Sequence, residues 1–317
     1  MTTNDRMGTR VLLSLALLAA VMIAGPFTGT QEAGAVTCPS TSTTDTADLD
    51  GFPDKCECNE ITLGDGQTKI NGFGTGTRSQ YMDPNSKDLI VWLQRAAGSL
   101  LTDTNDVLFQ PITNLAAPPG LGVTLHVYGT DIFRPTTDRE VMSSRTACTG
   151  TTITQKGAWI IEDNISSEGT SGTMIGSTNV VSTPNAAGNA STVYTRRLES
   201  FVDGVCAGYS TCIDSVYGFG KDPNNQATTM TDLYRLYHRQ NVNHELAHQM
   251  ALVPAPAPTK GKGGTSPTVT SAHYPTDPSG SLMEYSVYYK TDSGTNTVTW
   301  YIPANFIQYD VNSKRLK

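Results

Sequence analysis

The spacing of apolar residues predicts strands in the first half of the chain and helices in the second. Residues 88–93 form a short apolar run typical of a buried strand, and residues 122–128 alternate apolar and polar side chains. Residues 158–161 are a third candidate strand. Helical patterns follow over residues 192–204 and 231–252, and the second helix begins at a Thr-Asp N-cap. This order predicts an α+β fold in which a mixed, twisted β-sheet packs on a long helix.

Other stretches lack this periodicity. Residues 162–191 are rich in Gly, Ser, Thr and Asn, which predicts long surface loops. Residues 37–50 are rich in Ser, Thr and Asp, which predicts an extended or mobile arm. The tail, residues 297–309, is expected to form one or two strands of a smaller, irregular C-terminal lobe. We therefore expect an arm at 36–85 and a folded domain at 86–317, divided into lobes at 86–252 and 253–317.

The first 35 residues have the layout of a secretory signal peptide. Arg6 and Arg10 precede an apolar run over residues 11–24, and small residues follow as far as Ala35. The run is shorter than the roughly 20 residues that a membrane-spanning helix needs. The chain has a net charge of −7 and no Lys or Arg clusters, which argues against binding to nucleic acid or anionic membranes. We expect a secreted, monomeric protein.

All six cysteines follow this leader, and an even number in an exported chain is typical of a disulfide framework. Three disulfides are therefore expected. Only Cys206 and Cys212 are close enough in sequence to suggest a local loop, so the other pairings stay open. A zinc cluster on Cys56 and Cys58 is a weaker alternative, because no matching Cys-x-x-Cys pair follows.

The segment from His244 to His248 carries the strongest chemical signal in the chain. It reads His-Glu-Leu-Ala-His, and residues four apart on a helix share a face, so both imidazoles can reach one metal ion. Zinc held by imidazole nitrogens lowers the pKa of a bound water, and Glu245 can accept its proton and return it to a leaving amine. The pattern predicts a zinc-dependent endopeptidase whose substrates are proteins or peptides.

A catalytic zinc site normally has three protein ligands, which leave one position for water. Our candidate for the third is His273, because it follows a Pro- and Gly-rich stretch at 254–267 that can fold back over the helix. Glu284 is an alternative ligand of the gluzincin (thermolysin-like) type. That ligand belongs on a second helix, however, and the residues after Glu284 have a strand pattern.

From this motif onward, over residues 231–290, the chain resembles the metzincin clan of zinc endopeptidases. In that clan a third His and then a tight turn follow the zinc helix, and the turn places a methionine beneath the metal. The resemblance implies a metzincin-like fold and that methionine role for Met283. It also offers Tyr285 as an extra tyrosine ligand, although we favour a packed strand residue at this position. Ala251 and Pro254 stand where the clan has Gly and the third His, so the third ligand must arrive by a longer route.

An acidic segment precedes the predicted sheet. Asp48, Asp50 and Asp54 surround a Gly-containing turn, and closely spaced carboxylates can offer several hard oxygens to Ca²⁺. The spacing resembles the calcium loops of thrombospondin type 3 repeats, in one partial copy with Thr46 in place of a further Asp. We therefore expect Zn²⁺ as the catalytic cofactor and Ca²⁺ as a candidate second ion, against the alternative of an acidic turn without an ion.

Two alternatives to a peptidase of this organisation stay open. The chain could be a secreted calcium-binding adhesion or surface protein that retains a vestigial metal site. Residues 36–85 could also be a pro-segment that caps the zinc. The intact Glu245 favours an enzyme over a relic, because a relic has no need of the base.

Overall fold

The chain divides into two units, Met1–Val36 and Thr37–Lys317. All residues that the computed structural model describes belong to the second unit, so the predicted leader at 1–35 lies outside them. No helix among the described residues combines the length and the apolar character that crossing a membrane requires. The described residues are 37–63, 67–99, 104–113, 121–129, 148, 150–151, 153–155, 157–164, 176–178, 190–217, 227, 229–250 and 288–302.

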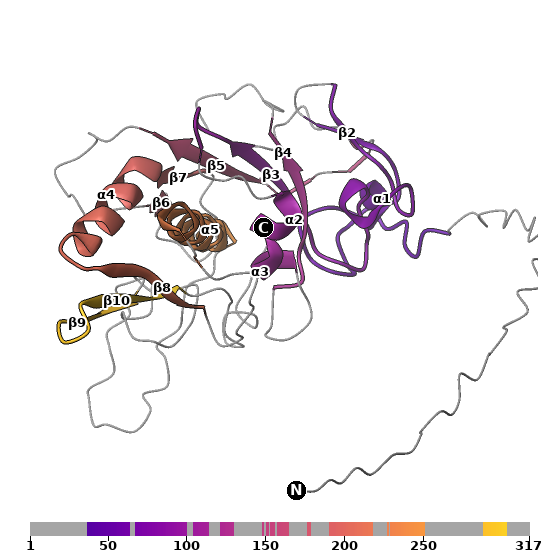
Figure 1. Cartoon of the computed structure of the whole chain (residues 1–317). Helices are drawn as coiled ribbons and strands as arrows, with labels where there is room; N and C mark the ends of the chain where they lie inside the picture. Colours follow the sequence, from indigo (N-terminus) through magenta and orange to yellow (C-terminus); the bar gives the residue numbers. More distant parts are fainter. Residues whose placement is uncertain are drawn as a thin grey trace, which may run out of the picture. The chain divides into compact units, whose positions relative to one another are not determined.

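Figure 1 shows the helices and strands of this unit. Its helices are α1 (Asp54–Glu57), η1 (Arg78–Gln80), α2 (Asn105–Leu108), α3 (Gln110–Thr113), α4 (Thr195–Cys206) and α5 (Met230–Gln249). Its strands are β1 (Ile61–Thr62), β2 (Lys69–Ile70), β3 (Asp88–Gln94), β4 (Thr124–Tyr128), β5 (Ala158–Asp163), β6 (Gly176–Thr178), β7 (Ala190–Tyr194), β8 (Thr211–Tyr217), β9 (Tyr288–Asp292) and β10 (Thr297–Ile302).

The largest described sheet has the strand order β4-β3-β5-β7-β6. Strands β4, β3, β5 and β7 run parallel, and β6 pairs antiparallel with β7 at the edge. Strand β3 has a neighbour on each side, and every residue of it except Gln94 is buried. The strands predicted at 88–93, 122–128 and 158–161 are confirmed as β3, β4 and β5. A mixed sheet combined with helices confirms the predicted α+β fold.

Helix α5 packs on one face of this sheet, as Figure 1 shows. Successive side chains of a strand point to opposite faces, so alternate residues of β3 point towards the helix. The C-terminal half of α5, which carries the histidine motif, lies against β5, β6 and β7. The core on this side consists of Leu89, Val91, Leu93, Leu108, Phe109, Ile112, Leu121, Val123, Leu125, Ala158, Ile160, Val193, Val242, Leu246, Ala247 and Met250.

Residues from the segment 37–63 pack on the other face of the sheet. Phe52 and Cys56 are fully buried there against Ile90 and Trp92, the β3 residues that point away from α5. Ile61, Leu63, Ile70 and Met82 complete this second core. The chain directly after the Ser/Thr/Asp-rich stretch at 37–50 therefore shares a core with the sheet.

Three disulfides form, as the cysteine count predicts. Cys206 pairs with Cys212, which confirms the local loop after α4. The other bridges, Cys38–Cys58 and Cys56–Cys148, both involve the segment at 37–63. The chain has no free cysteine. Two of the three bridges thus hold the N-terminal part of this unit. The Cys56–Cys148 bridge joins this part to a residue 92 positions further along the chain.

A second described sheet, of order β8-β10-β9, contains the C-terminal strands. Strand β10 runs parallel to β8 and antiparallel to β9. Trp300 of β10 is fully buried and packs with Leu198 and Val202 of α4 and with Leu233 and Tyr237 of α5. The strand predicted in the tail is confirmed as β10, and residues 303–309 of that prediction lie outside the described residues.

Two predicted segments differ from the structure. The helix expected at 192–204 begins only at Thr195, because residues 190–194 form β7 and pair with β5 and β6. The stretch at 162–191, expected to form loops, contains β6 as well as the first residues of β7. Both differences have one cause: sheet pairing, which is a tertiary interaction, overrides the weak local preference of short polar segments.

Candidate functional site

Helix α5 carries the two predicted metal-binding histidines on one face. The helix begins at a capping box in which the Thr229 hydroxyl accepts the Asp232 backbone N–H at 3.1 Å. Near its other end, His244 and His248 are each only 5% exposed, and their Nε2 atoms lie 3.0 Å apart. Two nitrogens on one tetrahedral zinc, each bound at about 2.0–2.1 Å, lie roughly 3.4 Å apart. The pair thus faces a common point at nearly the spacing of zinc ligands.

Glu245 lies beside these histidines and faces the edge strand β6. The Thr178 hydroxyl donates a short hydrogen bond to Oε2 of Glu245 and also lies 3.2 Å from the Glu245 backbone carbonyl oxygen. Gly176 leaves the space that the carboxylate occupies, because a Cβ at this position would lie only 2.3 Å from Oε1 of Glu245. The carboxylate is therefore held against β6 at a point where a side chain on the strand would displace it.

Burial changes the acidity of Glu245. Desolvation raises the pKa of its carboxyl from 4.5 to about 7, although the hydrogen bond from Thr178 acts in the opposite direction. A group with a pKa near neutrality can both accept and release a proton at physiological pH. The described part of the site thus combines two imidazoles with an acid–base group.

Two polar side chains fix the end of α5 to the sheet. Oε1 of Gln249 accepts the backbone N–H of Trp159 at 3.1 Å, and Nε2 of Gln249 donates to the Trp159 carbonyl at 2.9 Å. The same Nε2 donates to Oγ of Ser191 at 2.7 Å, and this hydroxyl donates to the backbone carbonyl of Glu245. His248 directly precedes Gln249, so its backbone cannot slide along the sheet without breaking these bonds.

Sequence reasoning does not select Gly176, Thr178 and Ser191, which contact Glu245. All three fall in the stretch at 162–191 whose composition predicts loops. The β-branched and aromatic residues from Ser191 to Tyr194 are a usable signal for a strand. The segment Gly-Ser-Thr at 176–178 carries no comparable signal, because its strand conformation depends on pairing with β7.

The residues predicted to complete the zinc site are His273, Met283 and Tyr285, with Glu284 as the alternative ligand. All four lie outside the described residues. The third ligand and the methionine turn therefore stay predictions. Comparisons with protein-family models, with curated proteins and with solved structures find no match for the chain.

A separate group of acids contains two of the three predicted calcium ligands. Asp48 and Asp50 each contribute an oxygen to it. Asp54 instead faces its own loop, where its carboxylate accepts the Ser40 hydroxyl at 2.5 Å and the Thr46 hydroxyl at 2.9 Å. The structure therefore brings Asp48 and Asp50 together with further acids and gives Asp54 hydroxyl partners of its own.

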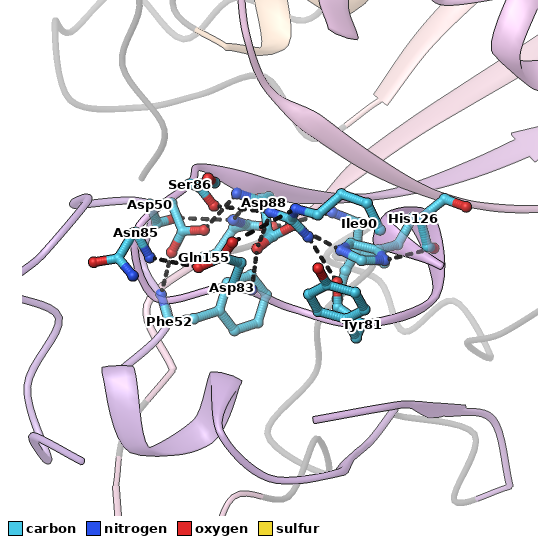
Figure 2. Close-up of polar contacts among 12 residues, drawn as sticks. Asp50, Phe52, Tyr81, Asp83, Asn85, Ser86, Asp88, Ile90, His126 and Gln155 are labelled. Atoms are coloured by element: carbon cyan, nitrogen blue, oxygen red, sulfur yellow. Dashed lines mark hydrogen bonds and ion pairs between the residues drawn. The ribbon is translucent and has the colours of Figure 1, made fainter. Parts of the chain in front are cut away.

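Three acids that sequence reasoning does not select complete this group: Asp45, Glu57 and Asp88. We call Asp45, Asp48, Asp50, Glu57 and Asp88 the acidic cluster. Figure 2 shows the contacts on one side of it, where Asp88 and Asp50 meet at the start of β3. No spacing rule links these residues, since Asp45 and Asp88 are far apart in sequence and only the fold brings them together.

Proposed function

We propose that this chain is a secreted zinc-dependent endopeptidase. The observation that carries the proposal is the arrangement on α5: the Nε2 atoms of His244 and His248 lie 3.0 Å apart, and the buried carboxylate of Glu245 lies beside them against a strand edge. The donor set of two imidazoles fits zinc, which favours nitrogen ligands of this kind. When bound, zinc supplies a Lewis acid and lowers the pKa of water to about 7.

Glu245 acts in this proposal as the general base and then as the general acid. Its carboxylate accepts a proton from the attacking water and donates it to the amine that leaves when the peptide bond breaks. The Thr178 hydroxyl holds the carboxylate in one place during both transfers, and the missing side chain of Gly176 leaves room for it. Orientation of this kind contributes to the rate because a displaced base loses its alignment with the reacting atoms.

The edge strand β6 supports a peptide as the substrate. Among the described strands, β6 pairs only with β7, so it is the end of the sheet. An edge strand presents backbone N–H and C=O groups with which an extended peptide can pair. Thr178 and Gly176 of this strand contact Glu245, so a peptide paired along β6 would pass next to the proposed base.

The proposal assigns the third zinc position to His273 and the supporting methionine to Met283, as in the metzincin arrangement that the sequence resembles. Tyr285 is the candidate for an additional ligand that contacts the reacting carbonyl oxygen. Secretion is part of the proposal because residues 1–35 have the pattern of a signal peptide. The three disulfides support it, since such bonds persist in oxidising compartments.

The decisive experiment measures two quantities in the purified chain: bound zinc, and cleavage of an unfolded protein substrate. The parent should bind one zinc and cleave, whereas Glu245→Gln should keep the zinc and lose cleavage by about 10²–10⁴-fold. Glu199→Gln is the matched control, because Glu199 lies on α4 and pairs with Arg196 at 2.9 Å. A parent without zinc, or a Glu245→Gln variant as active as the control, would overturn the proposal.

His273→Ala and Glu284→Gln distinguish the two candidates for the third ligand. The proposal expects His273→Ala to reduce zinc affinity by more than about a hundredfold, because changes in the groups around metal ligands already reduce it 10–100-fold. Glu284→Gln should retain the parental affinity. The reverse result would assign the third position to Glu284 and the protein to the gluzincin type.

A further inference from the structure

The acidic cluster brings five carboxylates together from three segments of the chain. Asp45, Asp48 and Asp50 come from the loop before α1, Glu57 ends α1, and Asp88 begins β3. The ligand oxygens of Asp45, Asp48 and Asp50 lie within 4.8 Å of one another, as do those of Asp50, Glu57 and Asp88. Asp50 is therefore the residue that links the two halves of the cluster.

Three members of the cluster have hydrogen-bond partners that explain their burial. Asp88 forms an ion pair with Arg78 at 3.0 Å, and its Oδ1 lies 2.8 Å from Nε2 of His126. Asp50 accepts the backbone N–H groups of Phe52 and Asp88, the second at 2.6 Å (Figure 2). Asp45 accepts two backbone N–H groups of its loop, from positions 49 and 51. These contacts are structural and do not by themselves indicate a ligand.

Glu57 is different, because its side chain is fully buried and neither carboxylate oxygen has a hydrogen-bond partner among the described residues. Both carboxylate oxygens of Asp48 are buried as well, with the backbone N–H of Asp50 and the carboxylates of Asp45 and Asp50 close to them. Lys87 is the nearby cation, but its Nζ donates to the backbone carbonyls of Asp48 and Leu49. An ionised carboxylate buried without a partner is strongly unfavourable. A cation bound between these oxygens would compensate their charge.

We propose that the acidic cluster binds a calcium ion, with Asp50, Glu57 and Asp88 as carboxylate ligands. All available donors are oxygens, which excludes a preference for soft or nitrogen-seeking metals. Calcium accepts six to eight oxygens at about 2.3–2.6 Å, so two oxygens on opposite sides of the ion lie about 4.8 Å apart. The oxygens of Asp50, Glu57 and Asp88 lie within 4.8 Å of one another, which matches this limit. Magnesium would demand a smaller, regular octahedron that keeps several waters.

The bound ion would fasten the N-terminal segment to the sheet. Asp50 precedes α1, Glu57 ends it, and Asp88, whose backbone N–H Asp50 already accepts, begins β3. Gln155 closes the same junction, because its Nε2 donates to the carbonyls of Asp50 and Asp88 at 2.8 and 2.7 Å (Figure 2). Calcium binding therefore stabilises packing far from the histidine motif in sequence.

The test uses the full chain after removal of all metals by dialysis, first against chelator and then against chelator-free buffer. Calcium chloride alone is titrated by calorimetry, and the melting temperature is followed. The parent should bind calcium with a Kd of about 10⁻³ M or tighter and melt about 5 °C or more higher at saturation. A parent with neither a binding heat nor a melting shift would overturn the proposal.

Glu57→Gln assigns the site. This variant should bind calcium at least about tenfold more weakly and lose most of the melting shift. In metal-free buffer it should melt at or above the parent, because it removes a buried acid that has no partner, and this result also shows that the variant folds. Glu60→Gln is the matched control, since Glu60 is exposed and pairs with Lys69, and it should respond to calcium like the parent. Parental calcium affinity in Glu57→Gln would overturn the assignment.

Adding zinc in place of calcium separates this inference from the proposed peptidase. Glu57→Gln should keep the parental zinc affinity, whereas His248→Ala should lose it and keep the calcium response. Loss of both responses in Glu57→Gln would show that the cluster supports the fold without binding calcium selectively, which overturns this inference and leaves the zinc proposal untouched.

Discussion

The histidine pair on α5 and the acidic cluster at the start of β3 are assembled in opposite ways. The histidines come from one turn of one helix, and the regular geometry of that helix places their Nε2 atoms 3.0 Å apart. The acids come from a loop, a short helix and a strand, and converge only because residues 37–63 pack on the sheet. A site built on one element can be identified from spacing, whereas a site built from several depends on the whole fold.

The difference also separates the chemistry of the two sites. Imidazoles on a helix suit zinc and a reaction, and the carboxylate beside them is held against an edge strand that a peptide can reach. The acidic cluster offers only oxygens and lies where the N-terminal segment meets β3, which suits calcium and stability. If this comparison is correct, the two sites respond to different variants and to different metals.

The largest effect is expected from a variant that disrupts the histidine site and leaves the acidic cluster intact. His244→Ala should reduce zinc affinity by more than about a hundredfold and bring cleavage below detection, because it removes a direct ligand. Zinc content by atomic absorption and a peptide-cleavage assay measure both quantities. His238→Gln is the control on the same helix, since Nδ1 of His238 lies 3.5 Å from Glu162 rather than near the pair. Equal loss of zinc in the control would contradict the assignment.

The next prediction compares how much two of the disulfides stabilise the fold. Cys56–Cys148 closes a separation of 92 residues and Cys206–Cys212 one of six. Chain entropy predicts a stabilisation of about 4–5 kcal/mol for the long bridge and about 2 kcal/mol for the short one. Paired Cys→Ala variants, compared by urea unfolding, should follow this order. A larger loss from Cys206→Ala with Cys212→Ala would show that the N-terminal segment depends little on its bridge.

A third prediction concerns pH and the buried His238 of α5. Burial lowers the pKa of this imidazole to about 4, and the adjacent Glu162 has its own pKa raised by burial. The folded-state pKa lies below the unfolded value of about 6.5, so the stabilisation is fully present above pH 6.5 and is lost as the pH falls towards 4. The loss amounts to about 3 kcal/mol over this window. Urea unfolding of parent and His238→Gln from pH 7 to pH 4 should show a flatter profile in the variant; identical slopes would refute the prediction.

The smallest predicted effect tests the contact between β6 and Glu245. Gly176→Ala would place a Cβ 2.3 Å from Oε1 of Glu245, so the carboxylate must move. We expect kcat to fall roughly a hundredfold, as for a base displaced by about 1 Å, with zinc content unchanged. Gly204→Ala on α4 is the matched control, because a Cβ there meets no atom within 4 Å. A kcat for Gly176→Ala within a factor of two of the control would disprove a positioning role for β6.

The parts of the fold that could be predicted are those governed by local pattern. The apolar run of β3 and the alternation in β4 indicate strands, and the helical repeat indicates α5, although its N-cap is Thr229 and not the predicted Thr231. Strand β6 could not be predicted, because Gly-Ser-Thr has no strand preference of its own and becomes a strand only by pairing with β7. The packing of residues 37–63 on the sheet could not be predicted from the sequence either, since few of their side chains are apolar.

The candidate sites follow the same rule. His244, Glu245 and His248 could be identified because helical periodicity alone brings them together. Glu57 could not, because its place in the acidic cluster depends on disulfides and on the core around Phe52. Acids near one another in sequence do not by themselves define a site, and Asp54, which accepts hydroxyls of its own loop, illustrates this.

The side-chain amide of Gln249 forms hydrogen bonds with both the backbone N–H and the backbone C=O of Trp159. These bonds join the last turn of α5 to β5. This joint does not involve a metal, unlike the folding of small zinc domains, which collapse only when the ion binds. Removing zinc should therefore leave the last turn of α5 on the sheet, so that the ion can be withdrawn and restored without refolding. If the chain is exported and binds zinc as proposed, it can leave the cell empty and be loaded outside, so that the supply of the ion decides when it becomes active.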